Sequence, residues 1–159
     1  MLFRSHSAVK PWRDEFDAAA KALGVTLRYV DVQGADDLGP AFAATTKGRA
    51  DALLVSGGSF EFAHRRQIIE LAARHRLPTL YTWREAAFDG GLMTYGVNLG
   101  ALSYRAAAYV DKILRGAKPG DLPIERPTKL ELIVNLKTAR VLKLDLPQSL
   151  VLRADRVIE

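Results

Sequence analysis

Residues 52–59 read Ala-Leu-Leu-Val-Ser-Gly-Gly-Ser, and this stretch decides the fold of the chain. Its first four residues form an uninterrupted apolar run, which is the pattern of a strand whose two sheet faces are both covered. The run ends abruptly in a small, glycine-rich turn, as is typical of the junction between a parallel strand and the helix that follows it. The stretch therefore predicts a βα unit.

The same alternation extends to both sides of this unit. Short apolar runs predict strands at residues 1–3, 25–30, 79–81 and 92–95, and amphipathic segments predict helices that end before Gly24, run from Asp36 to Gly48 and span 62–75. Strands that alternate with helices indicate a parallel sheet. Residues 1–97 are thus predicted to form an α/β domain with a parallel sheet.

The pattern changes after Asn98. A long helix is predicted over 99–115, with an apolar stripe made of Leu102, Ala106, Tyr109, Val110, Ile113 and Leu114. Three prolines within nine residues follow it and favour an extended connector. A strand over 130–134, a helix capped by Asn135 that ends near Leu142, and a C-terminal helix or tail complete the chain.

Composition excludes several classes of protein. With 159 residues the chain has the size of one domain, and its 48% hydrophobic content is that of a globular protein. No cysteine is present, which excludes disulfide scaffolds and thiolate zinc sites. No apolar run approaches the roughly 20 residues of a membrane-spanning helix, so no membrane insertion is expected. The first six residues are too short and polar for a signal peptide.

The net charge of +5 raises the question of nucleic-acid binding. Most of the surplus lies after residue 97, where single basic residues are separated by Asp111, Asp121, Glu125, Glu131 and Asp145. There is no basic run and no ladder of aromatic and basic residues for stacked bases. A scattered, solvated surface explains the charge, and no nucleic-acid partner is expected.

Ligands of open parallel sheets bind beyond the carboxyl ends of the strands, which directs attention to the loops at 5–9, 56–61, 82–85 and 95–98. In the second loop two glycines allow a backbone to approach a ligand, and Ser59 and Phe60 follow them. The loop is neither a P-loop nor a dinucleotide-binding fingerprint, because its glycine spacing is wrong and no Gly-Lys-Ser/Thr follows. The alternative is a tight βα turn in which Ser59 caps the next helix.

Trp83 and Arg84 form the second candidate. They could stack on an aromatic ligand and pair with a carboxylate, while Glu85 could hold the guanidinium in place. The alternative is the first turn of a helix, with an exposed arginine and a partly buried tryptophan. Tyr95, one strand further on, stands beside that pocket or fills the core.

Catalysis finds little support in the sequence. His64 and His75 lie eleven residues apart on different faces of one predicted helix, and His6 adds no metal-ligand spacing. No local signature favours a particular Ser-His-Asp set. We therefore expect no catalytic residue, no metal and no cofactor.

Five segments resemble a known family when they are taken in order. They read LAARHRLP at 71–78, GGLMTYG at 90–96, YVDKILRGAKPGDLP at 109–123, PTKLELIVNLKTA at 127–139 and LRADRVIE at 152–159. Together they are similar to the substrate-binding proteins of ABC transporters, whose members include tryptophan-type solute receptors.

This resemblance implies the architecture of type I periplasmic binding proteins, in which two α/β lobes close over a solute. Residues 1–97 would form the second lobe, the helix of 98–116 would return to a first lobe, and 117–159 would hold the connector, a crossing strand and the C-terminal helix or tail. Because most of a first lobe and an export signal have no counterpart, a truncated form is expected. The helix stripe is then expected to be exposed, or covered by self-association through 99–115.

The resemblance also implies a function without catalysis. A small solute, aromatic or amino-acid-like, would bind between the lobes, and an ABC transporter permease outside the cytoplasm would be the partner. Ser7, Ser59, Phe60, Trp83, Arg84 and Tyr95 are the expected contacts, chosen by their loop positions. The alternatives are a flavodoxin-like signalling or interaction domain and, less favoured, a small hydrolase or transferase.

Overall fold

The computed structural model describes residues 2–5, 10–56, 58–127 and 129–159, with side chains from Arg13 onward. Within these residues seven strands form one sheet in the order β2-β1-β3-β4-β5-β6-β7. The strands are β1 Leu2–Ser5, β2 Tyr29–Val32, β3 Leu53–Val55, β4 Thr79–Tyr81, β5 Met93–Val97, β6 Leu130–Asn135 and β7 Arg156–Ile158. Strands β1 to β5 pair with one another in parallel, which confirms the predicted α/β class with a parallel sheet.

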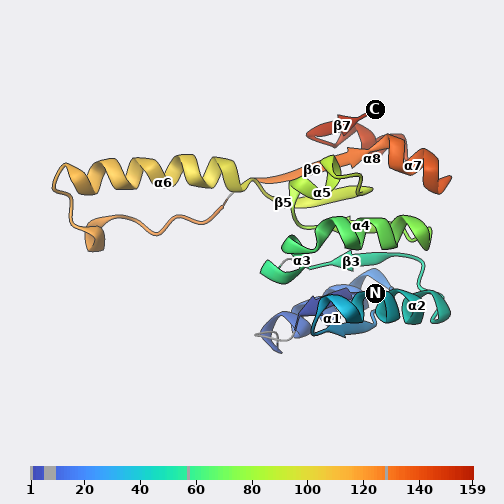
Figure 1. Cartoon of the computed structure of the whole chain (residues 1–159). Helices are drawn as coiled ribbons and strands as arrows, with labels where there is room; N and C mark the ends of the chain where they lie inside the picture. The colour runs from blue at the N-terminus through green and yellow to red at the C-terminus, as the bar shows by residue number, and fades with distance from the viewer. Residues whose placement is uncertain (1, 6–9, 57, 128) are drawn as a thin grey trace.

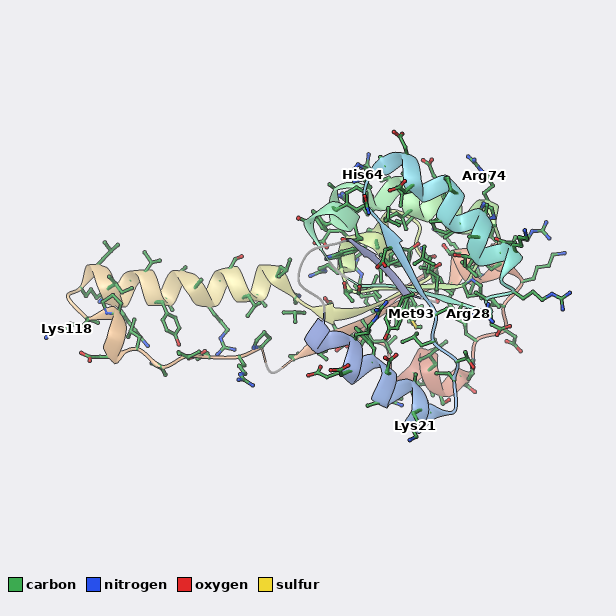
Figure 2. All side chains as sticks on the ribbon, turned by 90° about the horizontal axis from the view of Figure 1, so that it is seen from below. Lys21, Arg28, His64, Arg74, Met93 and Lys118 are labelled. Carbon is green, nitrogen blue, oxygen red and sulfur yellow. The ribbon has the colours of Figure 1, made fainter. Side chains whose placement is uncertain are left out.

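Eight helices and two short 3₁₀ turns connect the described strands. They are α1 Lys10–Leu23, η1 Ala35–Asp37, α2 Leu38–Lys47, α3 Ser59–Ala63, α4 Arg65–Arg74, α5 Arg84–Phe88, α6 Leu99–Leu114, η2 Pro119–Asp121, α7 Leu136–Leu142 and α8 Gln148–Leu152. Figure 2 shows α1, which carries Lys21, on one side of the sheet, and on the other side α4, which carries Arg74, with His64 just before it. The sheet is therefore covered on both faces, as the apolar run of β3 predicts.

The core lies between the sheet and helices α2 to α5. Phe42 from α2, Ile68 from α4 and Val55 from β3 are almost completely buried there. Tyr81 of β4 belongs to the same cluster, and its burial raises the pKa of the phenol well above its usual value. This cluster gives the sheet and its helices a hydrophobic core.

The chain after residue 129 returns to the same sheet. Strand β6 runs antiparallel to β5, and β7 pairs in parallel with β6. Asn135 at the end of β6 is the N-cap of α7: its side-chain oxygen accepts a hydrogen bond from Thr138 N at 3.1 Å, as the sequence predicts. Its Nδ2 donates to the carbonyl of Ala87 at 3.0 Å, so the same buried amide ties α7 to α5.

Residues 99–127, which we call the arm, extend away from the sheet. Figure 1 shows α6 projecting from one edge and the connector running back beside it. Tyr109 of α6 donates a hydrogen bond to the Pro123 carbonyl at 2.8 Å, and Arg105 pairs with Glu125. No residue of α6 is buried, and Tyr104 and Leu114 are more than four-fifths exposed.

Helix α6 is the longest helix of the described residues, and it has 16 residues. Among the helices that the structure describes, none is both long enough and apolar enough to span a bilayer.

Candidate functional site

The carboxyl ends of the parallel strands meet at one edge of the sheet, which we call the carboxyl edge. Strands β3, β4 and β5 end there at Val55, Tyr81 and Val97, and their loops lead into α3, α5 and α6. In Figure 1 the arm leaves the sheet from this edge. Loop residues of the carboxyl edge therefore face the space beside the arm, where a parallel sheet offers its ligand site.

Ser59 and Phe60 begin helix α3 at this edge. Ser59 is exposed, whereas Phe60 is half-buried and packs against the core cluster. The Phe60 ring also contacts the ring of His64, with 4.3 Å between the ring centroids. Gly58, not Ser59, is the N-cap of α3, so the capping role that the sequence offers Ser59 as an alternative is wrong. Ser7 lies outside the described residues.

Trp83 is the N-cap of α5 and half-buried against the core cluster. Its ring meets the edge of Phe62, with a centroid distance of 5.9 Å. The guanidinium of Arg65 lies over the Phe62 ring, 4.7 Å from its centroid. The same guanidinium donates a hydrogen bond of 2.7 Å to the carboxylate of Asp89. Phe62 was not predicted as a site residue from the sequence. The available signal was its position in the first turn of the helix that follows β3.

Arg84 follows Trp83 and forms its ion pair with Glu131 of β6, at 3.6 Å between Nη1 and Oε2. The side chains are 29% and 17% exposed, so the pair is shielded from water on most sides. The expectation that Glu85 holds this guanidinium is wrong. The partner of Arg84 is Glu131, which lies 47 positions later in the sequence. The two residues meet because β6 pairs with β5 and places Glu131 opposite Gly96.

Gly96 allows the loop that leads to Arg84 to lie close to Glu131. A Cβ at this position would collide with the carbonyl oxygen of Thr82, so only glycine lets the loop after β4 lie directly against β5. The Thr82 hydroxyl beside it is buried and has no hydrogen-bond partner among the described residues. Close packing at Gly96 therefore fixes the start of α5, and with it Arg84, beside Glu131.

Tyr95 lies on the other face of the sheet from this pair. Successive residues of a strand alternate between faces, and Gly96 is the residue opposite Glu131. Tyr95 is 49% exposed and pairs across the sheet with Leu132. The structure thus brings Trp83 and Arg84 together with Phe62 and Glu131, and places Tyr95 on the opposite side of the same edge.

A groove of about 400 Å³ lies where the arm joins the sheet. It is lined by Asn98, Leu102 and Arg105 of the arm base and by Lys129, Glu131 and Asp155. A hydrogen bond from the Leu132 backbone N–H, at 2.9 Å, lowers the pKa of the Asp155 carboxyl, and nearby Lys129 acts in the same direction. The groove thus carries both signs of charge.

In the part of the chain that the structure describes, no three His, Asp or Glu side chains gather as metal ligands would. What the carboxyl edge offers instead is an aromatic pair, a shielded guanidinium and an exposed serine. These groups can stack on a planar ring and donate hydrogen bonds to a carboxylate.

The comparisons with known proteins bear on the fold and the family of the chain. The fold is that of a periplasmic binding protein-like α/β domain. Residues 1–158 match the family described as ABC transporter substrate binding protein, and the chain belongs to that family. No curated protein matches the sequence.

Three solved structures share the fold. A conserved domain protein from Vibrio cholerae O1 biovar El Tor has a TM-score of 0.85 at 18% identity, with 98% of this chain and 54% of that chain covered. The ABC domain in complex with L-Trp from Streptococcus pneumonia has a TM-score of 0.87 at 22% identity, with 99% and 54% covered.

The third structure is the ligand-free, open form of CD0873, a substrate binding protein with adhesive properties from Clostridium difficile. It has a TM-score of 0.70 at 18% identity, with 99% of this chain and 53% of that chain covered. The chain therefore spans about half the length of each of these three structures.

Proposed function

We propose that this chain is one lobe of a solute-binding protein that delivers a small solute to an ABC transporter without changing it chemically. The observation that carries the proposal is the family match over residues 1–158. The structures of similar fold are about twice as long, which supports a second lobe as the missing half of the site. The chain would then be a truncated form of a two-lobed receptor that works outside the cytoplasm.

The carboxyl edge would supply one wall of the solute site. Ser59, Phe60, Trp83 and Arg84 line it on the α3 and α5 side, and Tyr95 stands on the other sheet face. Ser7 would join them from the loop after β1. Their chemistry suits a planar or aromatic solute that carries a carboxylate, and the L-Trp complex of one structure with the same fold agrees with such a solute.

The arm would connect this lobe to the second one. Its helix α6 has no buried residue, and five of its large apolar side chains are exposed in the described part of the chain: Leu99, Tyr104, Val110, Ile113 and Leu114. A solute that contacts both lobes binds the closed form more tightly than the open form, and this difference in affinity shifts the equilibrium toward closure. A transporter permease that recognises the closed form completes the import step.

The test is a titration of the chain with L-tryptophan, followed by ligand-observed NMR. Because a single lobe offers half of the contacts, we expect a dissociation constant in the millimolar range, which corresponds to a binding free energy on the order of −4 kcal/mol. Trp83→Ala and Arg84→Ala should each weaken binding roughly fivefold or more, since each removes one of the two main contacts. Tyr104→Ala, on the exposed side of the arm, is the matched control and should bind as the unchanged chain does.

Two results would contradict the proposal. One is binding that Trp83→Ala and Arg84→Ala leave unchanged, which would place the solute elsewhere. The other is conversion of the solute to a product during the titration, which would make the chain an enzyme.

A further inference from the structure

One oxygen of Glu131 serves two parts of the molecule. Oε2 lies 3.6 Å from Arg84 Nη1, and it also accepts a hydrogen bond of 3.4 Å from Asn98 Nδ2. Arg84 belongs to the proposed solute wall, whereas Asn98 is the residue from which the arm starts. Glu131 thus links the solute wall to the base of the arm through a single atom.

Asn98 controls the first turn of α6. Its Oδ1 accepts a hydrogen bond of 3.0 Å from Ala101 N, which is the N-cap interaction of the helix. The other end of the same amide is the group that donates to Glu131. A firm hold on Nδ2 keeps Oδ1 directed at Ala101, because both atoms belong to one planar group.

Arg84 and Asn98 share this oxygen of Glu131. A solute carboxylate that pairs with Arg84 competes with Glu131 for the guanidinium and adds a repulsion between two negative charges, so Arg84 moves away from Glu131. The Glu131 oxygen is then left to Asn98 alone. Three other charged residues line the groove beside Glu131, and each has an ion-pair partner other than Glu131: Arg105 pairs with Glu125, and Lys129 pairs with Asp155.

We propose that Glu131 is a positioning residue that couples the solute wall to the arm. When a solute carboxylate binds Arg84, Glu131 holds Asn98 more firmly, and the N-cap of helix α6 is strengthened. The inference rests on the proposed function and sharpens it: the solute must carry a carboxylate, and its arrival strengthens the cap at Asn98. The lobe would therefore sense the solute at the joint between the sheet and the arm.

The first part of the test needs no solute. It measures hydrogen exchange of the Ala101 amide by NMR in the 159-residue chain. Glu131→Ala should speed this exchange roughly three- to tenfold, because Asn98 loses its anchor. Arg84→Ala should slow it about twofold, because Glu131 then serves Asn98 alone.

Two further variants separate coupling from a merely structural role. Glu131→Gln keeps an acceptor oxygen for Asn98 but carries no charge for Arg84, so Ala101 exchange should stay close to that of the unchanged chain. Glu125→Ala is the matched control, because Glu125 pairs with Arg105 within the arm and touches neither Arg84 nor Asn98. It should leave Ala101 exchange unchanged.

The second part compares L-tryptophan with tryptamine, which has the same ring and no carboxylate. L-tryptophan should slow Ala101 exchange about twofold in the unchanged chain and in Glu125→Ala, and it should have no effect on it in Glu131→Gln. Tryptamine should not slow it in any of the three. Each variant is first checked for an unchanged amide spectrum away from the site, so that unfolding is not mistaken for loss of coupling.

The outcomes distinguish the two proposals. If Glu131→Ala and Arg84→Ala change Ala101 exchange in the same direction, or if neither changes it, the coupling through Glu131 is wrong whatever binds. If the variants behave as expected without solute but L-tryptophan leaves the Arg84 signals unchanged, the proposed function is wrong for this solute, and so is the inference that rests on it.

Discussion

The sheet with its helices and the arm differ in how they use their apolar residues. In the sheet region Phe42, Val55 and Ile68 are almost completely buried, whereas helix α6 has no buried residue at all. Several apolar side chains of α6, among them Val110 and Leu114, are exposed although the helix carries the apolar stripe of a packed helix. The difference teaches that the sheet region has its own core and that the arm contributes no buried helix residue to it.

The largest contrast is expected from matched deletions of apolar side chains. Phe42→Ala should destabilise the chain by about 3–5 kcal/mol, because it opens a cavity in the core. Leu114→Ala, at an 82% exposed position of the arm, should change stability by less than about 0.5 kcal/mol. Urea unfolding measures both, and equal losses would show that the arm belongs to the same packed core.

A smaller contrast is expected from two glycines. Gly96→Ala should cost about 1–3 kcal/mol, because its Cβ would collide with the Thr82 carbonyl and push the loop after β4 away. Gly120→Ala in the arm meets nothing within 4 Å and should be close to neutral. Thermal unfolding compares the two. A neutral Gly96→Ala would show that the start of α5 is not held against β5.

The smallest effect is expected from removal of the arm. Val97 and Leu130 are direct partners of the antiparallel pair β5–β6, so an Asn-Gly turn can join them in place of residues 98–129. The shortened chain should unfold within about 1 kcal/mol of the parent, since α6 buries none of its residues and a short turn costs less closure entropy. Loss of cooperative unfolding in urea would mean that the arm supports the sheet.

Much of the sheet region could be predicted because its signals are local. The apolar run at 52–55 is strand β3, Leu53–Val55, and Asn135 caps α7 as expected. Strand β7 could not be assigned, because Arg156–Ile158 is a three-residue strand that pairs only with β6, more than twenty positions earlier. Short strands of this kind carry no periodicity of their own.

The candidate site shows the same limit. Trp83 and Arg84 could be chosen as candidates because they follow strand β4 within three residues, and that rule uses only neighbouring residues. Their partners Phe62 and Glu131 were missed, since each comes from a different element that the tertiary fold brings near. Glu85 was the closest acid in sequence, but Glu131 is the acid opposite Gly96.

The central claim is that solute binds at the carboxyl edge of the sheet and not at its other end. The amino edge provides an internal comparison, since a groove of about 620 Å³ lies there between residues 24–28 and 48–54. Two-dimensional amide spectra recorded with increasing L-tryptophan test the claim most directly. The account predicts shifts at residues 58–60, 82–84 and 98–101 and none at 24–28; shifts confined to the amino edge would contradict it.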